Sequence, residues 1–213
     1  KGQLFKPGSA VASVNNAKGV AALKMIKSLT IYSNPDFLTF DSNATQALWE
    51  GGKLALATMW GSRGGNILDD KGSTSKITSN TVLAGAPTVG GGSTPATTLW
   101  WDGFTIAKNI SDKDAKATFI AMMKGISTEM VRANNDAAVW LIDGFVPGKS
   151  ATGVSASASA GATPYPMLPY AGLLHNALGS ELSEFLQGKE SAQQALSDVE
   201  AAYTASAKEK GFL

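Results

Sequence analysis

The sequence predicts an α/β protein that contains parts of two lobes. Segments with helical periodicity alternate along its 213 residues with short apolar runs that are bounded by glycine and proline. Strands interleaved with helices are typical of layered α/β proteins. The alternation is irregular, so a single doubly wound sheet is not required.

The first part of the chain predicts two helices and one strand. Asn15 or Asn16 can cap a helix that ends before Asn34-Pro35. The apolar positions of this helix recur at intervals of three: Val20, Leu23, Ile26 and Leu29. A second helix is predicted over residues 43–50, and the run LALATMW that follows Gly51-Gly52 is predicted to be a strand ending at Trp60.

The middle of the chain predicts two more strands and two helices. Residues 81–86 and the segment FTIAK, residues 104–108, have the composition of strands, and a glycine-rich connector lies between them. Ser111 can cap a helix that has acidic residues in its first turn, where the helix dipole favours them. A short helix follows over residues 127–134.

The last part of the chain is predicted to be helical after an exposed connector. The tract GVSASASAGATP, residues 153–164, consists of small residues and is interpreted as that connector. One helix is predicted over residues 171–187 and is broken by Gly188. A final helix runs from Ser191 to Gly211 with apolar residues at helical spacing.

Composition excludes several classes of function. A net charge of +1 without a dense basic cluster argues against binding to a nucleic-acid backbone. The absence of cysteine and the presence of a single histidine exclude thiolate chemistry, disulfides and a zinc site rich in Cys or His. The glycine tracts match neither nucleotide-binding loop pattern, so no cofactor is expected.

Three segments together resemble family 1 extracellular solute-binding proteins, the sugar-binding subunits of bacterial ABC importers. ALWEGGKLALATMWGS resembles the helix, Gly-Lys, strand and tryptophan unit of that family. WWDGFTIAKNISDKDAKATFIAMM resembles its next strand, turn and helix. The tail ELSEFLQGKESAQQALSDVEAAYTASAKEKG is similar to the closing pair of helices.

The resemblance implies a type II periplasmic-binding-protein-like fold, with two lobes and a hinge. It places residues 1–85 in the second lobe, returns residues 86–150 to the first lobe, and assigns the C-terminal helices of residues 151–213 to the second lobe. The part of the family's chain that builds most of the first lobe is missing here, so we expect self-association through the surface that it would cover.

The same resemblance implies a function without catalysis. The protein would be periplasmic or extracellular, with a lipid anchor as one option, and would deliver a mono- or oligosaccharide to a membrane permease. In the family, the segment PYPMLPY often presents an aromatic ring to the ligand, which makes Tyr170 a candidate.

Side chains that suit a sugar lie beside two apolar runs. Aromatic rings stack on the C–H face of a pyranose, and charged groups bond its hydroxyls. The candidates are Trp60, Arg63, Trp100, Trp101 and Asp102. Adjacent strand residues point to opposite faces, so we expect one of the two neighbouring tryptophans in the core and favour Trp101 with Asp102 for the ligand. Alternatively, both tryptophans fill the junction between lobes and Asp102 caps a turn.

Two other classes of function stay open. A glycoside hydrolase also uses aromatic platforms and acids, but it needs two carboxylates facing each other across a cleft. Asp102 is the only acid beside an aromatic pair. A structural or adhesive module would bind no small molecule at all.

Overall fold

The computed structural model describes residues 2–213 and divides the chain into two compact units. Unit 1 combines the residues up to Thr39 with Pro166–Leu213, and unit 2 is Phe40–Tyr165. Helices account for 51% of the residues and strands for 4%. The predicted α/β fold of the two-lobed type II class is therefore wrong, because the described residues are mainly helical.

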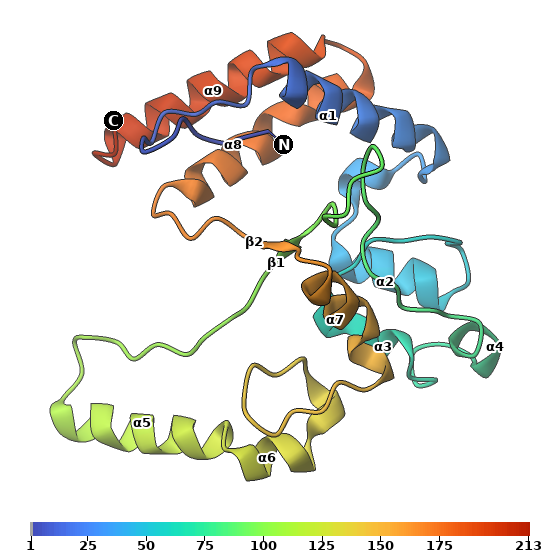
Figure 1. Cartoon of the computed structure of the whole chain (residues 1–213), viewed down its shortest axis with the longest axis vertical. Helices are drawn as coiled ribbons and strands as arrows, with labels where there is room; N and C mark the ends of the chain where they lie inside the picture. The colour runs from blue at the N-terminus through green and yellow to red at the C-terminus, as the bar shows by residue number, and fades with distance from the viewer. Residues whose placement is uncertain (1) are drawn as a thin grey trace. The chain divides into compact units, whose positions relative to one another are not determined.

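Unit 1 is built from three helices: α1 (Ala17–Leu29), α8 (Ala171–Gln187) and α9 (Ala192–Glu209). Short 3₁₀ turns at Thr30–Tyr32 and Phe37–Thr39 follow α1. Figure 1 shows α8 and α9 as a hairpin with α1 lying against α9.

The ends of these helices confirm the sequence prediction. Asn16 caps α1, since its side chain accepts the backbone N–H of Lys18 and Gly19, and the Ser191 side chain caps α9 in the same way. Gly188 ends α8 in the left-handed conformation, with φ of 81°, which glycine adopts at little cost.

The core of unit 1 lies along α9. Leu196, Val199 and Tyr203 are almost completely buried there, as the helical spacing predicts. The Tyr203 hydroxyl donates to the carbonyl of Ala10, and the Glu200 carboxylate accepts the backbone N–H groups of Val14 and Asn15. Two side chains of α9 therefore hold the N-terminal segment in place.

Unit 2 contains short helices and one pair of strands. The α-helices are α2 (Ser42–Glu50), α3 (Gly64–Ile67), α4 (Ser75–Thr78), α5 (Asp112–Gly125), α6 (Thr128–Ala133) and α7 (Thr152–Ser159). The 3₁₀ turns are Gly61–Arg63, Asn135–Ala137 and Lys149–Ala151. The strands are β1 (Thr98–Leu99) and β2 (Thr163–Pro164).

Three predicted strands do not form among the described residues. The segments of residues 54–60, 81–86 and 104–108 run without strand pairing. A strand is stabilised by hydrogen bonds and side-chain pairs with a neighbour, so its composition alone does not produce it. Leu56, Val82 and Phe104 from these segments are accordingly exposed.

Helix α7 replaces the predicted connector of residues 153–164. Its small residues allow close packing: a Cβ on Gly153 would lie 2.7 Å from the carbonyl oxygen of Ala84, and Ala156 lies against Gly85. Ser157 is buried, and its hydroxyl accepts the backbone N–H of Ala86 at 3.0 Å. The alanine and serine content therefore serves helix packing.

Helix α5 confirms its predicted span and cap. The Ser111 side chain accepts the N–H of Asp114, and both acids predicted in the first turn are present there. None of its residues is buried, so Phe119 and Met123 are exposed. The cap and the periodicity predict this helix correctly, although none of its side chains is buried.

Candidate functional site

Parallel strands β1 and β2 bring two aromatic side chains together in unit 2. Leu99 pairs with Pro164, and the Tyr165 N–H donates to the Leu99 carbonyl at 2.9 Å. Trp100 and Tyr165 are the residues that follow the two strands. Because the carboxyl ends of parallel strands meet at one edge, the two rings become neighbours, with centroids 4.7 Å apart and planes at 62°.

Trp60 extends this pair to a cluster of three rings. Its ring centroid lies 6.2 Å from that of Trp100, with an interplanar angle of 66°. Both distances and angles suit edge-to-face contact. Trp60 and Trp100 are each about half exposed, at 53% and 51%. We call Trp60, Trp100 and Tyr165 the aromatic cluster.

The turn after Trp60 is held by close backbone packing. A Cβ on Gly61 would lie 1.7 Å from a methyl group of Val154, and a Cβ on Gly64 would lie 2.1 Å from the carbonyl oxygen of Ser150. No side chain fits at either position without movement of its surroundings. The two glycines therefore allow the turn to lie directly against residues 150–154, which fixes the direction of Trp60 and Arg63.

Helix α2 supplies a polar rim for this turn. The Trp60 indole N–H donates to the Ser42 hydroxyl at 3.1 Å. The Arg63 guanidinium donates from Nη1 to Gln46 Oε1 at 2.7 Å and from Nη2 to Asn43 Oδ1 at 2.8 Å. Gln46 lies four residues after Ser42 and three after Asn43, so both of these residues are its neighbours on the helix surface.

Asp102 is tied to the cluster through Trp100. The Trp100 indole N–H donates to Asp102 Oδ1 at 3.1 Å, so this carboxylate lies beside the ring. An ionised carboxylate has about four acceptor positions, and one indole uses only one of them. Asp102 can therefore accept further hydrogen bonds from a ligand.

The neighbouring Trp101 lies outside the aromatic cluster. Its side chain is 43% exposed, and Trp100 is exposed as well. The expectation that one of the two tryptophans is a core residue is therefore wrong. The chain runs irregularly after β1, so strand alternation, on which that expectation depended, does not continue into this pair.

The structure places Tyr170 in unit 1, where it contacts other rings. Its centroid lies 4.9 Å from that of Phe5 and 5.8 Å from that of Phe212, and its hydroxyl donates to the Ser9 carbonyl at 3.3 Å. Tyr165, from the same PYPMLPY segment, joins the aromatic cluster instead. The residues before Tyr165 have no strand-like sequence pattern, so this arrangement depends on the pairing of β1 with β2.

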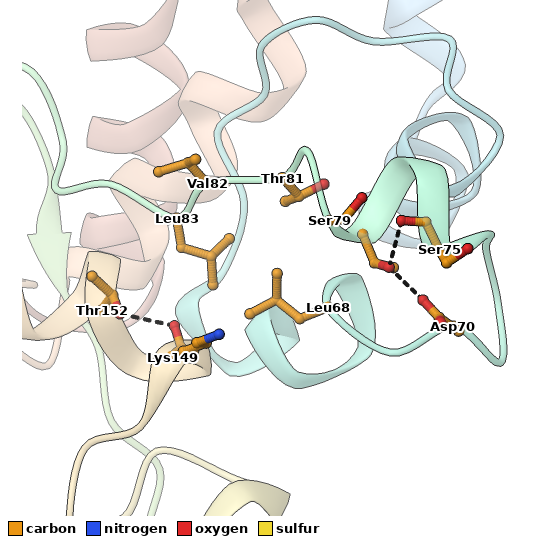
Figure 2. Close-up of a pocket in the computed structure, with 10 residues that line it drawn as sticks. Leu68, Asp70, Ser75, Ser79, Thr81, Val82, Leu83, Lys149 and Thr152 are labelled. Carbon is orange, nitrogen blue, oxygen red and sulfur yellow. Dashed lines mark hydrogen bonds between the residues drawn. The ribbon is translucent and has the colours of Figure 1, made fainter.

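A separate hollow of about 530 Å³ lies beside α3 and α4 in unit 2 (Figure 2). Leu68, Val82 and Leu83 form its apolar part. Its remaining lining residues are polar: Asp70, Ser75, Thr78, Ser79, Thr81, Lys149 and Thr152. Three of its five hydroxyls already donate within the protein: Thr78 to Asp70, Thr81 to the Ile77 carbonyl and Thr152 to the Lys149 carbonyl. This hollow is a weaker candidate than the aromatic cluster.

Metal and membrane sites are not evident in the part of the chain that the structure describes. No three His, Cys, Asp or Glu side chains gather there as metal ligands. No helix among residues 2–213 has the length and apolar character to cross a membrane.

No protein-family model matches the chain, and no curated protein matches it. We therefore infer the function from the chemistry of the aromatic cluster and of the α2 side chains beside it. Half-exposed tryptophans, a guanidinium held by α2 and a carboxylate all lie on unit 2, where Arg63 follows Trp60 by three residues and Asp102 bonds to Trp100. Such a surface can stack against a flat apolar face and bond a polar edge.

Proposed function

We propose that the protein binds a carbohydrate at the aromatic cluster of unit 2. The observation that carries this proposal is the contact of Trp60, Trp100 and Tyr165, three rings that come from distant parts of the chain yet leave the two tryptophans half exposed. Large apolar side chains that cluster at a surface commonly mark a binding site. A pyranose offers the flat C–H face that such rings accept.

The polar groups beside the rings suit the hydroxyls of a sugar. Asp102 lies against Trp100 and can accept hydroxyl hydrogen bonds, while Arg63 beside Trp60 can donate. The Ser42 hydroxyl holds Trp60, and the side-chain amides of Asn43 and Gln46 hold Arg63. Binding sites of this kind combine apolar faces with a few oriented polar groups.

We further propose that binding serves transport and involves no turnover. The basis is the resemblance of three sequence segments to the sugar-binding subunits of ABC importers. In this proposal the protein works in the periplasm or outside the cell, passes a mono- or oligosaccharide to a membrane permease and needs no cofactor. Since the described residues are mainly helical, the sugar would bind at the aromatic cluster and not between two closing α/β lobes.

Isothermal titration calorimetry with a panel of mono-, di- and trisaccharides tests the proposal. We expect at least one sugar to bind, and Trp100→Ala to weaken its binding by about tenfold, the equivalent of roughly 1.4 kcal/mol. Trp60→Ala should have a similar effect, because that ring belongs to the same cluster.

Trp101→Ala provides the matched control, since this residue is also a half-exposed tryptophan but does not contact the cluster rings. We expect its affinity to stay within about twofold of the wild type. The proposal would be overturned if no sugar of the panel bound, or if all three variants lost the same amount of affinity. Release of a shorter sugar during the titration would replace it with a glycosidase function.

A further inference from the structure

Arg63 is held firmly but has no acidic partner. Ion pairs that join Lys71 to Asp69 and Lys210 to Glu209 do not involve Arg63. The Arg63 guanidinium bonds instead to the neutral amide oxygens of Asn43 and Gln46. Its positive charge is therefore not neutralised by a carboxylate in direct contact.

The acidic residues at the two ends of α2 accept hydrogen bonds from groups other than Arg63. Asp41 caps the helix by accepting the N–H of Ala44 at 2.8 Å. Glu50 accepts the side-chain N–H of Gln46 at 2.7 Å, which turns the amide oxygen of Gln46 toward Arg63. This chain of hydrogen bonds fixes the guanidinium in one orientation without placing a carboxylate against it.

Arg63 also retains hydrogen-bonding capacity. A guanidinium carries five N–H donors, and the contacts with Asn43 and Gln46 use two of them. The residue is half-buried, lies three positions after Trp60 and donates its backbone N–H to the Trp60 carbonyl at 3.0 Å. A preorganised cation with spare donors therefore belongs to the same turn as a ring of the aromatic cluster.

We propose that the ligand is an acidic sugar, and that Arg63 binds the carboxylate of a uronic acid residue. This inference rests on the proposed carbohydrate-binding function and names its substrate class. The planar fork of arginine matches a planar carboxylate, and the charge strengthens each hydrogen bond. The single positive charge of one guanidinium matches the single negative charge of a carboxylate, whereas a phosphate carries up to two.

Calorimetry with matched neutral and acidic sugars tests the inference: glucose with glucuronic acid, galactose with galacturonic acid, and the corresponding disaccharides. We expect the acidic member of the preferred pair to bind about tenfold more tightly, as expected for hydrogen bonds to a charged group. Arg63→Gln should weaken the binding of the acidic sugar by about tenfold more than that of its neutral partner, so that the difference between them disappears. Arg63→Lys should restore part of it, because lysine keeps the charge but loses the fork.

Arg132→Gln is the control, since it removes one positive charge from α6 and leaves the turn after Trp60 unchanged. It should preserve the preference for the acidic sugar. Equal affinity for both members of each pair would overturn the inference and leave the carbohydrate-binding function standing. Equal binding of a sulfate-ester sugar would overturn the carboxylate assignment, and failure of every sugar to bind would overturn both proposals.

A purely structural role for Arg63 predicts a different pattern. If the residue only joined the turn to α2, Arg63→Gln would weaken the binding of neutral and acidic sugars by the same factor. Circular dichroism and thermal unfolding of each variant, measured on the full chain, would reveal such a loss of structure. A uniform loss of this kind would overturn the inference.

Discussion

The rings of Trp100 and Tyr165 contact each other edge to face, with centroids 4.7 Å apart, because each residue directly follows one of two paired parallel strands. The two-residue strands are too short to form a sheet of independent stability. The ring contact therefore adds to the small number of hydrogen bonds that hold β1 against β2.

A double-mutant cycle measures this contact. We expect Trp100→Leu and Tyr165→Leu to be coupled by about 0.5–1.5 kcal/mol in the free energy of unfolding, the range for aromatic pairs. Urea unfolding of the wild type, both single variants and the double variant gives the value. A cycle between Tyr165 and Trp49, whose indole bonds to Thr81, should give coupling near zero. Equal coupling in the two cycles would argue against a specific contact.

Gly61→Ala should destabilise unit 2, since the added Cβ would meet Val154 at 1.7 Å. Overpacking of this kind costs about 1–3 kcal/mol. Val154→Ala removes the opposing methyl groups, so the double variant should be more stable than Gly61→Ala alone. Thermal unfolding checks the order of the variants. Gly103→Ala is the control, because its Cβ would meet nothing within 4 Å; an equally large effect there would refute the steric explanation.

Ser157→Ala should lower the free energy of unfolding by about 1 kcal/mol, because it leaves the backbone N–H of the half-buried Ala86 without its acceptor. Chemical denaturation gives the difference. Ser159→Ala, an exposed substitution in the same helix, should be nearly neutral. Similar values for the two serines would mean that the Ser157 hydroxyl does not stabilise α7.

The stability of unit 1 should fall at alkaline pH through Tyr203. Burial, and to a lesser extent the nearby Tyr170, raise the pKa of Tyr203 above its usual value of about 10. The unfolded chain then loses the tyrosine proton first. This contribution is complete below about pH 10 and is lost as the pH rises through the pKa of the folded state.

Urea unfolding between pH 8 and pH 11 tests this prediction. Tyr203→Phe should unfold more easily at neutral pH, because it lacks the hydroxyl that donates to Ala10, but its stability should fall less steeply above pH 10. Tyr32→Phe, at an 83% exposed position, should follow the wild-type slope. An unchanged slope in Tyr203→Phe would contradict the assignment.

Helices with strong caps could be predicted from the sequence because their signals are local. Asn16, Ser111 and Ser191 each cap the helix that was expected after them, and Gly188 ends α8. The predicted strands failed because a strand depends on a partner elsewhere in the chain, which the apolar pattern does not identify. Helix α7 was missed because its tract of small residues lacks the periodic large apolar residues that indicate a helix and is typical of linkers.

The candidate site was predictable in part. Tryptophan beside a turn indicated Trp60, and the pair at residues 100 and 101 contains the second ring, but the sequence favoured Trp101 where the structure brings Trp100 into the cluster. Tyr165 could not be chosen over Tyr170, since only the register of β1 with β2 brings it to Trp100. The asparagine and glutamine that hold Arg63 carried no recognisable motif.

Helix α5 has a consequence for the rate at which its backbone exchanges hydrogen with solvent. With no buried residue, its 14 residues depend on the Ser111 cap and on hydrogen bonds within the helix, and an isolated helix of that length is only marginally stable. In deuterated water its amides should exchange within the early time points, whereas those beside Leu196 and Val199 in α9 should remain protected until larger parts of unit 1 open. Exchange would thus separate helices that rely on local signals from those that rely on a packed core.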